Sequence, residues 1–196
     1  SALGSNGEHE TFNTPLVSPL HTSTLVHAPR IVLLSLFDGI GTAMLAVLDI
    51  LREESMIPEL ALALFIELDL QLASGVERHW AEQASQQNIP RFTKLAADVW
   101  DPLRVQMHTI LSFCFALPVG AVVLLIGGSP CTNLTRAGFR RGALGLCGKD
   151  SFHFYAFPVY GWFIQFMRPD VHVLCFVENA HNMPPSWAEH ICKALG

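Results

Sequence analysis

Five short apolar runs, separated by longer mixed stretches, make up most of the chain after residue 29. The runs are IVLLSLF at 31–37, LALALFIE at 60–67, RFTKLAAD at 91–98, AVVLLIGG at 121–128 and VHVLCFVEN at 171–179. Continuous apolar segments of this length are typical of parallel strands that are buried on both faces of a sheet. We therefore predict five parallel strands.

The stretches between these runs have the length and the mixed polarity of helices. They cover residues 42–54, 70–87, 101–113 and 150–167. Parallel strands need such crossover connections, so the alternation predicts an α/β fold with a doubly wound sheet. We expect one more helix over residues 186–196.

Residues 1–29 differ from the rest of the chain in composition. They are rich in Ser, Thr, Pro, Asn and His and show no sustained period, which is typical of a flexible arm or linker. A chain of 196 residues has room for one domain with a substantial core. We expect that domain over residues 30–196.

The charge and the polarity of the chain limit what it binds. Hydrophobic residues make up 51% and charged residues 15% of the sequence, a balance that fits a sheet covered on both faces. The formal net charge is −5, whereas a protein that binds nucleic acid unaided needs a clustered excess of Lys and Arg to neutralise phosphates. The composition therefore argues against a self-sufficient nucleic-acid binder.

The cysteines and the longest uncharged segment each exclude a class of protein. The five cysteines form no CxxC pair and are odd in number, so we expect neither a disulfide framework nor a zinc site, and a reducing intracellular compartment. The apolar run over 110–126 has the length of a membrane span, but Pro118 and Gly120 divide it. Its second part is short and β-branched, which favours a buried strand over a membrane span.

In a doubly wound sheet, ligands bind beyond the carboxyl ends of the strands, so the residues after each strand are the candidates for chemistry. After the first strand, the glycines of FDGIG at 37–41 allow a close approach of the backbone to a ligand, or form an ordinary tight turn. Glu67 follows the second strand, where a carboxylate can accept hydrogen bonds from both ribose hydroxyls of a nucleoside cofactor. A solvated surface glutamate is the alternative.

The third predicted strand ends at Asp98, which Val99 and Trp100 follow. A carboxylate here can accept a hydrogen bond from an adenine amino group while apolar neighbours flank the ring. Because Asp101 and Pro102 look like a helix start, Asp98 is equally suited to capping that helix. The sequence does not decide between a ligand contact and a helix cap for Asp98.

The fourth strand leads into GGSPCTNL at 127–134, which sets Cys131 on a loop at the ligand edge of the sheet. A thiol in this place is a candidate nucleophile, although a lone cysteine is more often a small buried hydrophobe. The fifth strand ends in Glu178 and Asn179. If the fourth and fifth strands are neighbours, thiol and carboxyl share a pocket; otherwise the pair caps the next turn.

Taken in order, FDGIG, Glu67, Asp98, GGSPCTNL and the ENA at 178–180 resemble the successive motifs of the cytosine-5 DNA methyltransferase family. The aromatic-rich SFHFYAF at 151–157 makes the resemblance closest to the eukaryotic de novo branch. It covers residues 30–183 and implies a Rossmann-like, S-adenosylmethionine-dependent methyltransferase sheet. Because family members continue with an arginine-containing motif, a target-recognition region and further strands, we expect a partial catalytic domain, truncated after the fifth strand.

The resemblance also implies a role for each motif residue. Cys131 is the nucleophile that adds to carbon 6 of cytosine, and Glu178 contacts ring nitrogen 3 and the exocyclic amine. The expected S-adenosylmethionine site consists of Phe37, Asp38, Gly39, Ile40, Gly41, Glu67, Asp98, Val99 and Trp100, and the residues expected to position the substrate are Ser129, Pro130 and Asn179. The implied partner is DNA with its target cytosine flipped out of the duplex, without metal or membrane, and in the nucleus if the source is eukaryotic.

Two other functions remain open. The pattern SPC-x-x-LTRAG at 129–138 is also similar to the tRNA cytosine-5 methyltransferase branch, which uses the same chemistry. The other alternative is a protein of a different class, a catalytically incompetent module. Such a module would bind S-adenosylmethionine or assemble with a methyltransferase partner, as a homo- or hetero-oligomer.

Overall fold

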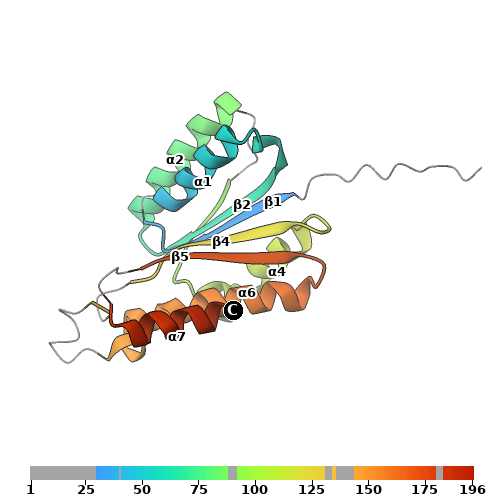
Figure 1. Cartoon of the computed structure of the whole chain (residues 1–196). Helices are drawn as coiled ribbons and strands as arrows, with labels where there is room; N and C mark the ends of the chain where they lie inside the picture. The colour runs from blue at the N-terminus through green and yellow to red at the C-terminus, as the bar shows by residue number, and fades with distance from the viewer. Residues whose placement is uncertain (1–29, 40, 88–91, 131–133, 136–143, 180–182) are drawn as a thin grey trace, which may run out of the picture.

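A five-stranded, all-parallel sheet forms the centre of the computed structural model (Figure 1). The structure describes residues 30–39, 41–87, 92–130, 134–135, 144–179 and 183–196. The strand order is β3-β2-β1-β4-β5, with bounds Ile31–Leu36 for β1, Leu60–Glu67 for β2, Phe92–Ala96 for β3, Val122–Gly128 for β4 and His172–Glu178 for β5. All five predicted strands are confirmed, and their order is compatible with a Rossmann-like fold.

Helices cover both faces of this sheet. On one face lie α1 (Thr42–Glu53) and α2 (Leu70–Gln87); on the other lie α4 (Met107–Ala116), α6 (Ala156–Met167) and α7 (Pro185–Leu195) (Figure 1). The central strand β1 is buried over its whole length, because it has a neighbouring strand on each side and a helical layer on each face. The sequence IVLLSL therefore shows no polar alternation.

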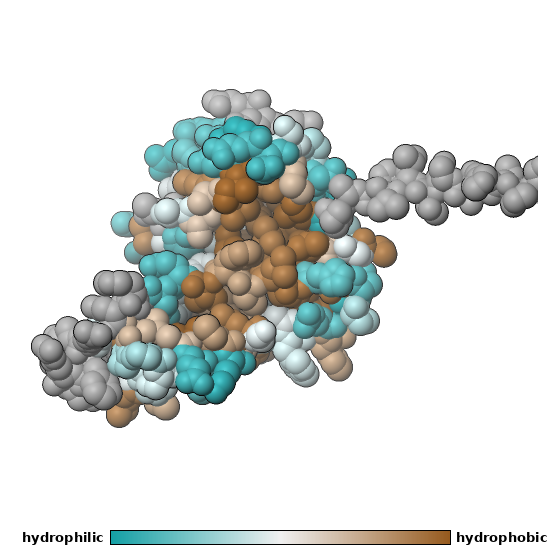
Figure 2. Space-filling view, in the orientation of Figure 1, coloured by the Kyte–Doolittle hydropathy of each residue, from teal (hydrophilic) through white to brown (hydrophobic). Residues whose placement is uncertain are grey.

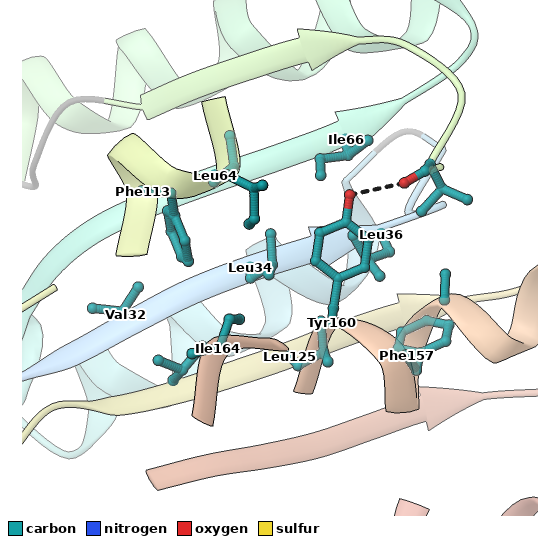
Figure 3. Close-up of a cluster of buried hydrophobic side chains, with 14 of the residues drawn as sticks. Val32, Leu34, Leu36, Leu64, Ile66, Phe113, Leu125, Phe157, Tyr160 and Ile164 are labelled. Carbon is teal, nitrogen blue, oxygen red and sulfur yellow. Dashed lines mark hydrogen bonds between the residues drawn. The ribbon is translucent and has the colours of Figure 1, made fainter. Parts of the chain in front are cut away.

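The larger part of the core lies between the sheet and α6. Figure 3 shows Tyr160, Phe157 and Ile164 of α6 facing Leu34 and Leu36 of β1. The hydroxyl of Tyr160 donates a hydrogen bond to the carbonyl oxygen of Val99 at 2.8 Å, and burial raises the pKa of this phenol well above its ordinary value. The only polar atom of the Tyr160 side chain is thereby satisfied inside an apolar layer.

Two of the predicted helices begin or end differently in the structure. The stretch predicted as one helix over 101–113 is two helices, α3 (Asp101–Arg104) and α4. The stretch 150–167 begins with the 3-10 helix η3 (Ser151–Tyr155), and α6 starts only at Ala156. Pro158 explains this start, because it has no N–H and is tolerated only in the first turn of an α-helix. The helix predicted over 186–196 is confirmed as α7.

Over the outer strands, the face that carries α1 is largely open. Leu174 and Phe176 of β5 are 48% and 60% exposed, and Ile50 of α1 is 58% exposed. A groove of about 500 Å³ separates α1 from β4 and β5. Figure 2 shows this hydrophobic surface between α1 and α6. Within the described residues, the second helical layer is therefore incomplete at the β5 edge.

The described residues contain neither a membrane-crossing helix nor a cluster of metal ligands. Within this part of the chain, no helix has both the length and the apolar character that crossing a membrane requires. No group of three or more His, Cys, Asp or Glu side chains in the same part is arranged to hold a metal ion.

A polar clasp joins the end of α6 to the loop between α4 and β4. The guanidinium of Arg168 donates to the carbonyl oxygens of Cys114, Leu117 and Pro118 at 3.0, 2.7 and 3.3 Å. Asp170 accepts a hydrogen bond from the backbone N–H of Gly120 at 3.1 Å and pairs with Arg168. The clasp adds a charged donor to carbonyl groups at and just after the carboxyl end of α4, where helix hydrogen bonding runs out. Cys114 and Pro118 also accept the backbone N–H groups of Leu117 and Ala121.

We expect Asp170→Asn to destabilise the protein at pH 7 and to change how its stability depends on pH. Hydrogen bonds from Arg168 and from the N–H of Gly120 hold the pKa of Asp170 well below its ordinary value of 3.8. A lowered pKa in the folded state stabilises the protein above pH 3.8, and this contribution is lost as the pH falls through the folded value. Urea unfolding at pH 7, 5 and 3 should show a smaller difference in unfolding free energy between the unmodified protein and Asp170→Asn at pH 3 than at pH 7. A constant difference would contradict this explanation.

Candidate functional site

A pocket of about 300 Å³ lies at the carboxyl edge of the sheet, where the polar residues after β1, β2, β3 and β4 meet. Its lining comes from every one of these strand ends, from α2 and from η3. It consists of Phe37, Gly39, Ile66, Glu67, Leu68, Leu72, Ala97, Asp98, Val99, Gly128, Pro130 and His153. Of the residues predicted for the site, the structure thus brings together Phe37, Gly39, Glu67, Asp98, Val99 and Pro130.

The loop after β1 approaches this pocket in a conformation that is costly for its first residue. Phe37 has a φ of 56° and Gly39 a φ of 55°, in the left-handed region that only glycine adopts freely. The backbone N–H of Phe37 donates to the carbonyl of Ile66 at 3.2 Å, so pairing with β2 holds the residue in place. Sparsely populated backbone conformations of this kind concentrate at functional sites.

Asp38 faces the helix and lies outside the pocket lining. Its carboxylate accepts hydrogen bonds from the N–H groups of Ala43 and Met44 at 2.8 and 2.9 Å, and from the hydroxyl of Ser35 at 3.1 Å. Burial raises the pKa of this carboxyl group above its ordinary value, against the effect of these hydrogen bonds. Asp38 therefore fixes the loop by satisfying the first amides of α1.

Two other residues of the predicted cofactor loop have different positions. Gly41 packs against Val76 of α2, where a β-carbon would lie 3.0 Å from the methyl groups of that valine. Gly41 thus serves the contact between the loop and α2 and does not line the pocket. Ile40 lies outside the described residues.

Glu67 connects two loops at the pocket. Its carboxylate accepts the N–H of Gly39 at 3.1 Å and the N–H of Asp69 at 3.0 Å, one on each oxygen. A carboxylate has about four acceptor sites, so two remain for the hydroxyl groups of a ligand. Glu67 is therefore not a freely solvated surface residue, because it is half-buried and two backbone N–H groups fix its carboxylate.

Asp98 and Val99 line the pocket after β3, and Trp100, which follows them in the chain, does not. One oxygen of Asp98 accepts a hydrogen bond from the backbone N–H of Trp100 at 2.9 Å. This bond closes an Asx turn. The side chain does not cap α3, whose N-cap residue Trp100 has no side-chain cap bond. Val99 is held by the buried hydroxyl of Tyr160. The indole N–H of Trp100 donates to Nδ1 of His153, which does line the pocket.

The ends of β4 and β5 are neighbours, as the shared thiol and carboxyl site requires. Gly128 pairs with Glu178, and a β-carbon at Gly128 would lie 2.7 Å from a carboxylate oxygen of Glu178. The side-chain amide of Asn179 donates to the hydroxyl of Ser129 at 3.4 Å. Glu178 is exposed and lies beside the pocket without lining it.

Cys131 lies outside the described residues, but its chain neighbour Pro130 does not. Pro130 lines the pocket, and its carbonyl accepts a hydrogen bond from the hydroxyl of Ser151 at 3.2 Å. Ser151 is fully buried in η3. The start of the cysteine loop is thus tied to the same 3-10 helix that supplies His153.

Sequence reasoning missed His153, which lines the pocket. It also missed Ser151 and Tyr160, whose hydroxyl groups hold the pocket residues Pro130 and Val99. All three lie in or just after the aromatic-rich run at 151–157, which we used only as a sign of resemblance. The signal available was a serine and a histidine two positions apart among aromatic residues. Polar side chains in such a run need partners, because the aromatic neighbours bury them.

The chain matches no protein-family model, and neither the curated proteins nor the solved structures include a match. The chemistry of the site is therefore defined by its own geometry. That geometry combines two carboxylates with free acceptor sites, apolar walls and, beside it, an exposed glutamate. Such a pocket suits a nucleoside-like ligand with hydroxyl and amino donors.

Proposed function

We propose that this chain carries the S-adenosylmethionine site and the nucleophile of a cytosine-5 methyltransferase that acts on DNA. One observation carries the proposal: the residues after β1, β2, β3 and β4 that resemble the family's motifs line one pocket at the carboxyl edge of a parallel sheet. Such an edge is where open α/β sheets bind nucleotide-like ligands.

The residues of the pocket fit the adenosine part of the cofactor. Glu67 has acceptor sites left for the two ribose hydroxyls, and Asp98 has an oxygen left for the adenine amino group. Phe37, Ile66 and Val99 supply apolar surface against which a purine ring can pack. The cofactor itself would supply a methyl group on a sulfonium sulfur.

Cys131 and Glu178 would divide the work on the cytosine ring. In this proposal the Cys131 thiolate forms a bond to carbon 6, which makes carbon 5 nucleophilic enough to take the methyl group. Glu178 shares a proton with ring nitrogen 3 and so stabilises the charge that develops during addition. A base such as water then takes the proton from carbon 5, the double bond to carbon 6 forms again, and the Cys131 sulfur leaves as thiolate. The pairing of β4 with β5 supports this division, because it brings Glu178 next to the strand that leads to Cys131.

Mechanism-based trapping tests the proposal. The chain is incubated with S-adenosylmethionine and DNA that contains 5-fluorocytosine, whose fluorine cannot leave as the proton does. We expect a covalent complex that survives denaturing electrophoresis and is lost in Cys131→Ala. Cys147→Ala is the matched control, because Cys147 is an exposed free cysteine and should leave the complex intact.

A parallel reaction with 5-fluorocytosine tRNA separates the two substrates. A complex with tRNA alone would replace DNA by tRNA in the proposal, with the same chemistry. Binding of S-adenosylhomocysteine without a complex on either nucleic acid would refute the catalytic function and leave a cofactor-binding module.

A further inference from the structure

The imidazole of His153 is held at the wall of the pocket by contacts from two sides. Its Nδ1 accepts a hydrogen bond from the indole N–H of Trp100 at 3.1 Å. The ring of Phe37 meets it edge to face, with centroids 5.8 Å apart. His153 lines the pocket together with Asp98 and Glu67. The ring therefore has a defined orientation in the folded protein.

The hydrogen bond from Trp100 also decides where the proton of the imidazole lies. A neutral imidazole has one N–H donor and one acceptor nitrogen. Because Nδ1 is the acceptor for the indole, the proton of the neutral ring is on Nε2. Within the described part of the chain, no residue is hydrogen-bonded to Nε2. The pocket wall thus carries an N–H donor that none of the described residues uses.

Trp100 links this donor to the carboxylate of Asp98. Its backbone N–H donates to one oxygen of Asp98 at 2.9 Å, while its indole N–H donates to His153. One residue therefore fixes an acceptor, the second oxygen of Asp98, and a donor, Nε2 of His153, on the same pocket. Adenine presents the complementary pair, an amino donor flanked by the ring acceptors N1 and N7.

We propose that His153 is a specificity-determining residue that donates from Nε2 to a ring nitrogen beside the amino group of adenine. The inference rests on the proposed function, because it takes the ligand to be the adenosine part of the cofactor. In this inference Asp98 and His153 together recognise the purine, and Trp100 is the positioning residue that holds both. An acceptor oxygen in place of the amino group would face the Asp98 carboxylate, so the pair selects adenine over hypoxanthine.

Calorimetry with S-adenosylhomocysteine on the whole chain tests the role of His153. In His153→Asn the side-chain oxygen can still accept from Trp100, but the donor at Nε2 is lost, and we expect the affinity to fall five- to tenfold, as for one neutral hydrogen bond of about 1 kcal/mol. His190→Asn is the matched control, because His190 is exposed and contacts Tyr155 instead of the pocket. It should leave the affinity unchanged.

Analogues of the ligand identify the atom that His153 contacts. The 1-deaza and 7-deaza forms of S-adenosylhomocysteine each replace one ring nitrogen by a C–H group. We expect one of them to bind the unmodified protein at least fivefold more weakly, and we expect His153→Asn to bind that analogue and the parent ligand equally. A merely structural role of His153 would weaken all three ligands alike.

The outcomes separate this inference from the proposed function. If the unmodified chain binds S-adenosylhomocysteine and His153→Asn binds it equally well, the inference is wrong and the proposed cofactor site stands. If the unmodified chain does not bind S-adenosylhomocysteine, both are wrong. If the deaza analogues lose the same affinity in His153→Asn as in the unmodified chain, His153 does not read the purine.

Discussion

Replacing Gly127 by alanine should destabilise the protein by about 3–5 kcal/mol, from backbone strain and overpacking together. Gly127 lies in β4 with a φ of 141°, a region that side chains rarely adopt. A β-carbon there would overlap the carbonyl oxygen of Leu36, the residue of β1 with which Gly127 pairs. Neither strand can move away easily, because both are central in the sheet.

Urea unfolding followed by circular dichroism measures this effect, and Gly75→Ala is the control. Gly75 lies inside α2, where a β-carbon would meet nothing within 4 Å. Alanine should stabilise that helix by about 0.5–1 kcal/mol, because glycine loses more backbone entropy on folding. A Gly127→Ala variant within 1 kcal/mol of the unmodified protein would show that the backbone at this point can relax.

The consequence of Gly127→Ala reaches the candidate site through Leu36. Leu36 directly precedes Phe37, whose backbone is already in a strained conformation. A shift of the Leu36 carbonyl would therefore displace the loop that carries Phe37 and Gly39 into the pocket. Gly127 thus allows β4 to lie close to β1, and Gly128 leaves room for the side chain of Glu178.

The five strands could be predicted because their burial leaves a direct mark on the sequence. A strand such as β1 is buried over its whole length, so only Ser35 interrupts its apolar run and its bounds are easy to find. The break between α3 and α4 has no such mark, because the two residues between them, Val105 and Gln106, include neither glycine nor proline. Tertiary packing decides where one helix ends there.

The candidate site could be predicted only as far as the strand ends. Glu67 and Asp98 line the same pocket, which the sequence could indicate because parallel strands all end at one edge. The direction of a side chain was harder: Asp38 turns to the amides of α1, which depends on where that helix starts. His153 reaches the pocket from η3, far along the chain, and no spacing rule connects it to Phe37 or Trp100.

The adjacency of Gly128 and Glu178 was a condition that the sequence alone could not settle. Five strands can be arranged in many orders, and the apolar runs do not distinguish among them. The order β3-β2-β1-β4-β5 meets the condition. Glu178 therefore lies beside the strand that leads to Cys131, and rate measurements can test its role.

We expect Glu178→Gln to lower the rate of methyl transfer to DNA by about a hundredfold or more, within the range for a residue that shares a proton in the transition state. Glutamine keeps the size and hydrogen bonding of the side chain but cannot exchange a proton with ring nitrogen 3. Glu178 is exposed and does not line the pocket. The variant should therefore fold normally and bind S-adenosylhomocysteine with unchanged affinity.

Single-turnover transfer of a radioactive methyl group and calorimetry with S-adenosylhomocysteine distinguish the explanations. Glu53→Gln, an exposed glutamate at the end of α1, controls for the loss of one negative charge and should change neither quantity. If Glu178→Gln transfers methyl groups within a few-fold of the unmodified rate, Glu178 does not share a proton with cytosine. If cofactor affinity falls in parallel with the rate, Glu178 acts through Gly128 on the shape of the pocket, since its carboxylate lies against that residue.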